Sequence, residues 1–351
     1  MASCTRASRC WDTLAVVSTT ILAGALVMGC ANKPKPSATT KPVVMGKPVF
    51  DFARGAGALP LDGASKPGSR EELAKRLLQG YQARLQLAED HEAIAANGES
   101  YPRLELLRID VSNATVRQDY KPTQANTVRE DLEPVLSVGE FEYLASPLRY
   151  GDRVTHWQLK VRDAKFGILP EKGERAALVL TDASEGYLEF SAKVTDLKPM
   201  MLRGAHAHAK AGFWVKDAAV SLASEDARSL SALLRVQAVW MLIPTTFHIS
   251  GQMHIDDSFH VTLSNVACEG EDMGGSLLAS LIGPAIRKYN GRVLPLAKWP
   301  GDRVELRDVV IRVDDTLRMT VWFGQRRLAG ADEQRGEEAM ARGGQMRLID
   351  N

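Results

Sequence analysis

The sequence lacks the features that mark several protein classes. Four cysteines in 351 residues are too few for a disulfide scaffold. Neither sign of charge is in excess: 44 Lys and Arg oppose 43 Asp and Glu, so the formal net charge is +1. Nucleic-acid-binding proteins normally carry a clear basic excess, and that class is therefore excluded. The remaining composition, 45% hydrophobic and 25% charged, is that of a globular protein with enough chain for one large or two ordinary domains.

Motifs of the common enzyme classes are missing as well. The chain has no P-loop, dinucleotide-binding fingerprint, nucleophile elbow or Cys-x-x-Cys. Cys268 ends an apolar stretch, which predicts a buried and inert thiol rather than a nucleophile. Glu269, Glu271 and Asp272 form an acidic run without the spacing of a calcium loop, and we interpret this run as a solvated loop. We expect a protein without enzymatic activity and without a cofactor.

Long hydrophobic runs are scarce, and the one near the N-terminus is short. Residues 14–28 are mostly apolar, whereas a membrane-spanning helix needs about 20 such residues. Arg6 and Arg9 precede this run, and a positive start followed by a short apolar stretch predicts an export signal. The run ends in the sequence VMGC, at residues 27–30, which resembles the lipobox of bacterial lipoproteins.

The lipoprotein resemblance gives this segment a role. It implies that residues 1–29 are cleaved and that Cys30 carries acyl chains such as palmitate. The alternative is an ordinary cleaved signal in which Cys30 has no special role. Several acyl chains make a membrane anchor stable where one is marginal. Ala31, in place of the Asp that resembles an inner-membrane retention signal, favours the outer membrane, facing the periplasm. The expected location is thus the bacterial cell envelope.

Residues 30–68 lack the apolar content of a core and predict a tether. Six of the 16 prolines lie in this stretch, and Lys33, Lys35, Lys41 and Lys47 make its first part basic. Such a segment buries too little apolar surface to offset the entropy of ordering it. Its basic residues would suit anionic lipid head groups, and a soluble spacer is an equally good interpretation. At the other end, residues 325–351 predict a flexible charged tail.

Two amphipathic helices are predicted. The first begins at the capping box Ser69-x-x-Glu72 and continues to about Ala95. Its apolar stripe, at spacings of three and four residues, consists of Leu73, Leu77, Tyr81, Leu85 and Ala88. The second helix covers Ser276 to about Lys298, with a break at Gly283-Pro284. Stripes of this kind are typical of helices that cover a core.

From about Leu104 to Phe323 the chain is mostly strand-like, and one pattern recurs four times. The pattern is apolar-x-apolar-x-Asn/Asp-Ala/Val-x-apolar, with its polar residue at Asn113, Asp163, Asn265 and Asp308. After this residue the apolar positions change parity, which would turn the core face to solvent unless one residue is inserted. The pattern therefore predicts a β-bulge at each Asn or Asp. The alternative is that each strand ends in a turn there.

Two of the copies lie in predicted hairpins whose arms carry apolar residues at odd positions. The arms are joined by Asp-Asp-Ser and by Asp-Asp-Thr. Loops of three residues, which pair Ile255 with Phe259 and Val313 with Leu317, are the simplest solution, and longer loops of the same parity also fit. The clean alternation predicts an antiparallel sheet with one apolar and one wet face.

Bulged strands, long hairpins and a helix laid along a curved sheet resemble the tubular lipid-binding (TULIP) superfamily and the AsmA-type envelope proteins. The resemblance spans about Ser69 to Phe323. It implies an α+β fold over residues 69–324: a long, highly curved antiparallel β-sheet with bulged strands, wrapped around one or two long amphipathic helices. It also implies an apolar groove for acyl chains. The residues that could line the groove are Phe247, Ile249, Met253, Val261, Leu263, Met319, Val321 and Phe323. Taken singly, each of them is better explained as core.

Histidines are the only candidate metal ligands. His206 and His208 share one face of a predicted strand, and the first hairpin would place His254 opposite His260. Two such pairs brought together could bind Zn²⁺ or Cu²⁺. The spacing H-E-x-x-H does not occur, and the hairpin histidines lie on its wet face, where a polar side chain needs no special role. We predict no metal site.

These patterns together predict a non-enzymatic, membrane-anchored envelope lipoprotein that binds or shields a lipid or another apolar ligand. Its partners would be the membrane, through the acylated N-terminus, and the lipid ligand, with no nucleic acid. Two alternatives stay open: a scaffold that binds another envelope protein without a ligand, and a metal-binding protein that uses the four histidines.

Overall fold

The computed structural model of the protein describes residues 50–51, 58–88, 92–117, 132–151, 153–171, 175–198, 213–299 and 303–325. The predictions for the export signal, for acylation at Cys30, for most of the tether and for the tail after Gln325 lie outside these residues and stay predictions. Both segments predicted to be flexible are corrected at their edges. Residues 58–62, placed in the tether, form a strand in which Leu59 and Leu61 are buried. Gln325, with which the tail was predicted to begin, is the last residue of a strand.

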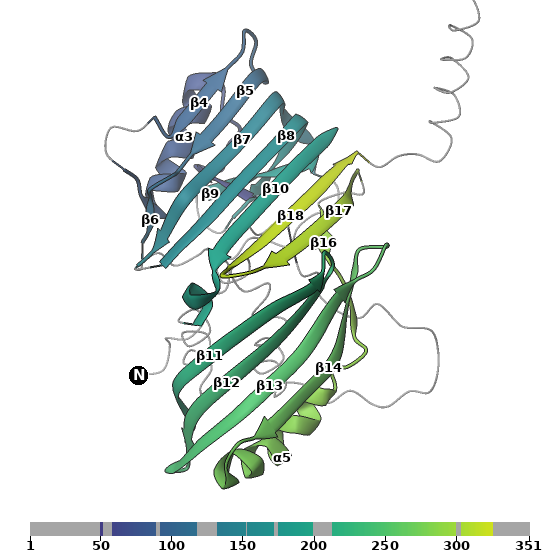
Figure 1. Ribbon diagram of the computed structural model, residues 1–351. Coiled ribbons are helices and arrows are strands. Elements are labelled where there is room, and N and C mark those ends of the chain that lie inside the picture. The colour runs from purple at the N-terminus through teal and green to yellow at the C-terminus, as the bar shows by residue number, and fades with distance from the viewer. Residues whose placement is uncertain are drawn as a thin grey trace, which may run out of the picture.

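An eleven-stranded sheet forms the upper part of the molecule in Figure 1. Its main path runs in the order β17 (Val304–Val313), β18 (Thr316–Gln325), β10 (Glu185–Lys193), β8 (Arg153–Pro170), β7 (Pro134–Tyr150), β5 (Arg103–Asp110) and β4 (Ile94–Asn97). Off this path, β2 (Ala58–Asp62) pairs with β9 (Arg175–Asp182), and β3 (Leu85–Gln86) pairs with β6 (Thr115–Val116). Because β5 and β6 run parallel to β7, the prediction of a wholly antiparallel sheet is wrong at this edge.

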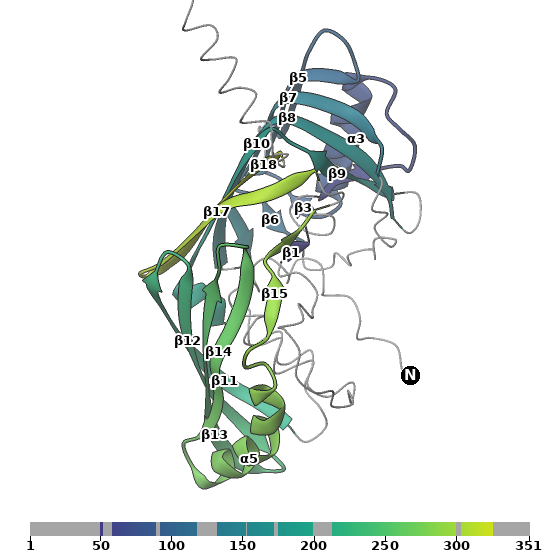
Figure 2. The same cartoon turned by 90° about the vertical axis from the view of Figure 1, so that its right-hand side faces the viewer.

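A five-stranded antiparallel sheet lies below it in Figure 1. Its order is β11 (Phe213–Asp226), β12 (Ser229–Trp240), β13 (Ile243–Ile255), β14 (His260–Gly270) and β15 (Val293–Pro295), and β1 (Phe50–Asp51) forms a separate parallel pair with β16 (Ala297–Lys298). Helices α3 (Arg70–Gln82) and α5 (Met273–Arg287) lie on the same side of the molecule, behind the sheets in Figure 1 and to their right in Figure 2. The fold is α+β and mostly β, as predicted. Its strands divide between two large sheets, where the family resemblance implies one.

The predicted β-bulge is confirmed in two of the four copies, and at Asp163 the strand changes its buried face without a bulge toward β7. At Asn265 and Asp308 the register to the neighbouring strand shifts by a residue, as a β-bulge requires. At Asp163, with φ of 49°, β8 changes its buried face within the strand; β7 makes the same change opposite it, so the two strands stay in register. At Asn113 the alternative is correct, because this residue lies in a turn between β5 and β6.

One of the two predicted hairpin pairings is confirmed. Val313 pairs with Leu317 across a short loop. In the other hairpin, however, Ile255 pairs with Val261 rather than with Phe259.

Asp256 accounts for the longer loop. Its carboxylate accepts hydrogen bonds from the backbone amides of Ser258 (2.9 Å) and His260 (2.8 Å) and so stabilises a wider turn. As a consequence His254 lies opposite Thr262, and the predicted pairing of His254 with His260 is wrong.

Helix α3 begins as predicted but ends early. Ser69 is its N-cap and accepts a hydrogen bond from the amide of Glu72 (3.2 Å). The carboxylate of Glu72 accepts from the amide of Gly68 (2.7 Å), so the box closes one residue earlier than its usual form. The helix ends at Gln82 and not near Ala95, because the following residues leave the helix to pair as β3 and β4 within the sheet.

Close contacts hold α3 against the sheet. A Cβ atom at Gly80 would lie 2.5 Å from the carbonyl oxygen of Pro60 in β2, so glycine permits an approach that any side chain would prevent. Arg76 is buried in the same helix and donates hydrogen bonds to backbone carbonyls of the loop at residues 62–65. The helix is therefore attached to the end of β2 by polar as well as apolar contacts.

Helix α5 begins at Met273, three residues before the predicted start, because Asp272 serves as its N-cap and accepts from the amide of Gly275 (2.6 Å). It continues through Pro284, so the predicted break is wrong; buried side chains on both sides of this proline keep the helix packed on β13 and β14. It ends at Arg287 rather than near residue 298, since residues 293–295 pair with β14 as β15.

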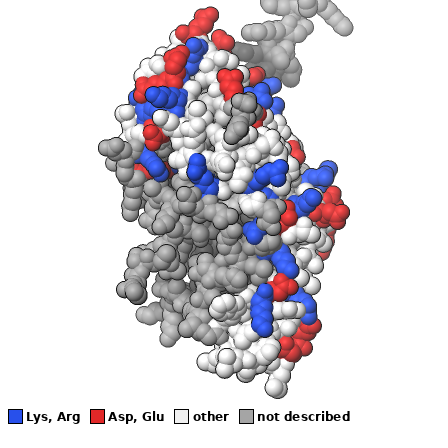
Figure 3. All heavy atoms as spheres, turned by 90° about the vertical axis from the view of Figure 1, so that its left-hand side faces the viewer, with Lys and Arg blue, Asp and Glu red and all other residues white. Residues whose placement is uncertain are grey.

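The two large sheets are joined through β17 and the turn between β11 and β12. The amide of Ile311 donates to the carbonyl of Ala227 (2.7 Å), and the guanidinium of Arg228 binds both Asp308 (3.0 Å) and Asp257 (2.6 Å). Buried apolar residues of both sheets belong to one continuous cluster. Charges of both signs are interspersed over the face seen in Figure 3, in line with the balanced composition.

Candidate functional site

Alternation along the strands gives the eleven-stranded sheet one apolar face. In β10, Leu188 and Phe190 are buried, whereas Tyr187 and Glu189 point to the opposite, more open side. There the hydroxyl of Tyr187 donates to the carboxylate of Glu189. The neighbouring strands repeat this arrangement, so the buried side chains of several strands lie on one side of the sheet.

The eight predicted ligand-lining residues are all buried, and they divide between the two sheets. Five lie on β13 and β14 and three on β18: Phe247, Ile249, Met253, Val261 and Leu263, then Met319, Val321 and Phe323. Helix α5 packs on β13 and β14, so the first five act as core between a helix and a sheet. The three on β18 belong to the apolar face of the eleven-stranded sheet.

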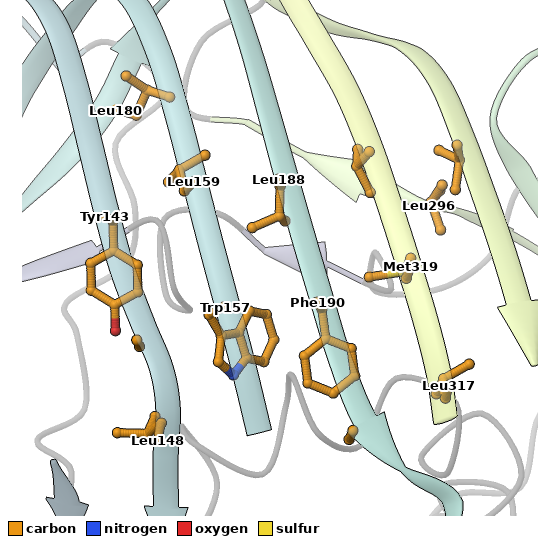
Figure 4. Packing of buried hydrophobic residues seen from close by; sticks show 14 of the residues in the cluster. Tyr143, Leu148, Trp157, Leu159, Leu180, Leu188, Phe190, Leu296, Leu317 and Met319 are labelled. Carbon is orange, nitrogen blue, oxygen red and sulfur yellow. The ribbon is translucent and has the colours of Figure 1, made fainter. Parts of the chain in front are cut away.

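On that face lies a row of large side chains of which only Met319 was predicted. The rings of Trp157 in β8 and Phe190 in β10 have centroids 4.3 Å apart. Phe190 also lies opposite Met319 of β18, and Trp157 lies opposite Ala145 of β7, so the row crosses four strands. Figure 4 shows Trp157, Phe190 and Met319 together with Tyr143, Leu148, Leu159, Leu180, Leu188 and Leu317. We call this set the aromatic row. The alternation of each strand was visible in the sequence, but the neighbours of each strand were not.

The aromatic row is electrically neutral. The rings of Tyr143 and of Tyr81 from α3 are stacked with centroids 6.3 Å apart, and burial raises the pKa of both phenols above the ordinary value. Both therefore stay uncharged in neutral solution. The indole of Trp157 donates to the hydroxyl of Thr155 (3.2 Å), which satisfies its polar group within the sheet. What the row presents is apolar contact, suited to an acyl chain or another apolar group.

The histidines do not form the considered metal site within the described residues. His206 and His208 lie outside these residues, as does His91, and the four described histidines all have different neighbours. His254 is hydrogen-bonded to Ser229 (2.9 Å), and His248 contacts Glu271 (3.1 Å). In the described parts of the chain, no group of three or more His, Cys, Asp or Glu side chains is arranged to hold a metal ion.

Cys268 and the acidic run that follows it have structural roles. Cys268 is buried, as predicted, and burial raises its pKa to about 11. The acidic run is exposed, as predicted, but it is not wholly a loop: Glu269 lies in β14, and the carboxylates of Glu271 and Asp272 have partners. Arg235 forms two 2.8 Å hydrogen bonds with Glu271 and thereby lowers the pKa of Glu271. Asp272 caps α5 and accepts from the amide of Thr246 (2.8 Å).

Within the described residues, no helix combines the length and the apolar character needed to cross a membrane. Comparisons with protein-family models, with curated proteins and with solved structures found no match to this chain. Its function therefore has to be inferred from its own residues and their arrangement.

Proposed function

We propose that the protein is a non-enzymatic lipoprotein of the bacterial cell envelope that binds or shields a lipid or another apolar ligand. The observation that carries this proposal is the aromatic row, in which Trp157 and Phe190 connect the apolar side chains of four neighbouring strands. Ligand sites for apolar molecules are lined mainly by aromatic and aliphatic side chains. The row has this composition and carries no charge.

The ligand would lie along the side of the eleven-stranded sheet that faces the helices. Helix α3 packs on β2, β3 and β4, at one end of the sheet, and the aromatic row occupies the middle strands (Figure 4). Because Trp157 and Phe190 are buried, a bound acyl chain would replace the contacts that they now make. Each methylene of the chain buried in this way contributes about 0.8 kcal/mol, which offsets the contacts that are lost.

The export signal and the anchor complete the proposal. The sequence of residues 27–30 resembles a lipobox, and acylation of Cys30 would attach the protein to the membrane. A tethered domain with a neutral apolar face suits the storage or shielding of an apolar molecule close to a membrane. This part rests on the sequence alone.

Lipid extraction and native mass spectrometry of the full chain, purified from bacterial envelopes, test the proposal. A lipid that co-purifies in addition to the N-terminal acyl chains is expected. Uptake of a fluorescent fatty acid should fall several-fold in Trp157→Ala and in the milder Trp157→Leu. It should be unchanged in His156→Ala, which alters the neighbouring residue on the opposite face. Recovery of the protein without lipid, together with no uptake by the parent chain, would contradict the proposal.

A further inference from the structure

Exposed apolar side chains gather at the end of the five-stranded sheet that lies farthest from the eleven-stranded sheet (Figure 1). The turn between β12 and β13 consists of Met241 and Leu242, whose exposed fractions are 69% and 94%. Met273, the first residue of α5, is 89% exposed. The turn and the helix are neighbours, since a Cβ atom on Gly274 would lie 3.0 Å from the side chain of Ile243. The set that we name the apolar tip is Met241, Leu242, Ile243, Met273, Leu277 and Leu281.

Met241 and Leu242 are unfavourable residues for the turn that they form. Trp240 pairs with Ile243, so the loop has two residues, and their φ angles are 47° and 71°. A two-residue turn with positive φ at both positions strongly prefers Asn-Gly. Long apolar side chains are strained in this region, and because they are exposed they gain no compensating burial. The stability of the fold does not explain these residues, whereas contact with an apolar phase does.

The charges near the tip fit a surface with anionic head groups. Helix α5 contains no Asp or Glu, and Arg287 and Lys288 are exposed at its C-terminal end. Among the preceding carboxylates, Glu271 is engaged by Arg235 and Asp272 by the N-terminus of α5, whereas Glu269 is exposed on β14. In Figure 3 the lowest end of the molecule is mostly uncharged, and acidic and basic side chains lie directly above it.

A tryptophan flanks the tip on the other face of the sheet. Trp214 in β11 is 71% exposed, and it follows Phe213, which pairs with Trp240 beside the turn. Lys216 is exposed two residues further along the same strand and therefore on the same face as Trp214. Tryptophan and lysine are enriched where a protein meets the boundary between hydrocarbon and water.

We propose that the apolar tip docks on a lipid bilayer with anionic head groups and inserts Leu242, Met273 and their neighbours into its interface. This site is separate from the aromatic row and serves contact with a membrane surface rather than the binding of a single ligand. A surface with apolar side chains and basic side chains beside them binds membranes in two ways: it buries apolar area in the bilayer, and it attracts anionic lipids electrostatically. Arg287 and Lys288 would lie at the level of the head groups.

An environment-sensitive fluorophore on the tip tests the proposal in the full chain. Cys4, Cys10 and Cys30 are replaced by serine, Cys268 is protected by its burial, and one cysteine is introduced as Leu242→Cys and labelled with nitrobenzoxadiazole. Vesicles of phosphatidylcholine, with or without a minority of phosphatidylglycerol, are then added. Because the label reports only its own surroundings, attachment of the chain to the vesicle elsewhere does not imitate insertion of the tip.

The matched control is a label at Ser258→Cys, in the exposed loop at the opposite end of β13. We expect a several-fold rise and a blue shift at position 242 with phosphatidylglycerol, a smaller rise without it, and no change at position 258. A label at Leu277→Cys should respond in the same way and should lose its response when Met241→Asn and Leu242→Gly are added. That double substitution installs the preferred turn sequence, so folding is preserved while the apolar surface is removed.

Three results would overturn the proposal. The first is that the label at position 242 remains exposed to water on vesicle-bound protein. The second is that the label responds without vesicles as the protein concentration rises, which would identify a second copy of the chain as the occupant. If the fluorescence response at position 242 is the same with and without phosphatidylglycerol, the proposed recognition of anionic head groups is wrong. Fatty-acid uptake by the aromatic row should be the same in the Met241→Asn, Leu242→Gly variant, so the two proposals fail separately.

Discussion

Replacing Gly80 by alanine should destabilise the protein, although helix propensity alone predicts the opposite. Inside a helix alanine is favoured over glycine by about 0.8–1.0 kcal/mol. At Gly80 a Cβ atom would lie 2.5 Å from the carbonyl oxygen and 2.8 Å from the carbonyl carbon of Pro60. The strand that holds Pro60 is paired with β9 over its whole length, so its backbone has little freedom to withdraw. Overpacking typically costs about 1–3 kcal/mol of stability. We expect a cost at the upper end for Gly80→Ala, because the new methyl group meets backbone atoms, which cannot move aside as a side chain could. The net loss is then about 2 kcal/mol.

Urea unfolding followed by circular dichroism measures this loss, and thermal unfolding should show a decrease in Tm of roughly 4–8 °C. Gln79→Ala is the matched control: it places an alanine at the neighbouring, exposed position of the same helix and should change the free energy of unfolding by less than about 0.5 kcal/mol. If Gly80→Ala is as stable as the parent while the control behaves as expected, the close approach of α3 to β2 is wrong.

Two further predictions concern titratable groups. At pH 8, Cys268 should react with a disulfide reagent about 100-fold more slowly in the folded than in the unfolded chain, because burial raises its pKa from 9.0 to about 11; equal rates, measured with the other cysteines replaced by serine, would contradict its burial. Hydrogen bonds from Arg235 lower the pKa of Glu271, so this pair stabilises the fold above the ordinary pKa of 4.5, and its contribution is lost as the pH falls through the lower value of the folded state. Arg235→Ala should therefore reduce stability at pH 7 and make little difference in strong acid; an equal loss at both pH values in urea unfolding would refute this role.

The strand pattern could be predicted where the determining interaction is local. The bulges at Asn265 and Asp308 follow from the parity of apolar residues within one strand, which needs no knowledge of the partner. Ser69 and the start of α3 are predictable for the same reason, since a capping residue acts within one turn. The end of α3 is not, because Leu85 pairs with Val116 from a distant part of the chain, and tertiary pairing overrides the helical spacing.

The candidate site depends on distant pairing to a greater degree. Phe190 belongs to the aromatic row because β10 lies between β8 and β18, and β18 comes more than a hundred residues later in the sequence. Alternation gives the face of each side chain but not its neighbour in the next strand. The predicted histidine pair is wrong because of a local contact. The carboxylate of Asp256 accepts a hydrogen bond from the amide of His260, which widens the loop and moves His260 away from His254. The sequence contains one sign of the apolar tip, which is Met-Leu at a two-residue hairpin turn that would prefer Asn-Gly. This sign can be recognised only once the ends of β12 and β13 show that a turn lies there.

The two proposed lipid contacts differ in what they require of the fold. Leu188, in the aromatic row, is buried and stabilises the sheet whether or not a ligand is present, so a polar substitution there should lower both stability and ligand uptake. Leu242 is exposed at a positive φ angle, and replacing it with glycine should raise stability while it abolishes membrane docking. The stability of the fold therefore explains why a leucine is present at position 188, whereas at position 242 it would favour glycine. A side chain that costs the fold free energy and shields nothing within it needs a partner outside the chain, and Arg287 and Lys288, exposed at the end of a helix without carboxylates, favour an anionic bilayer as that partner.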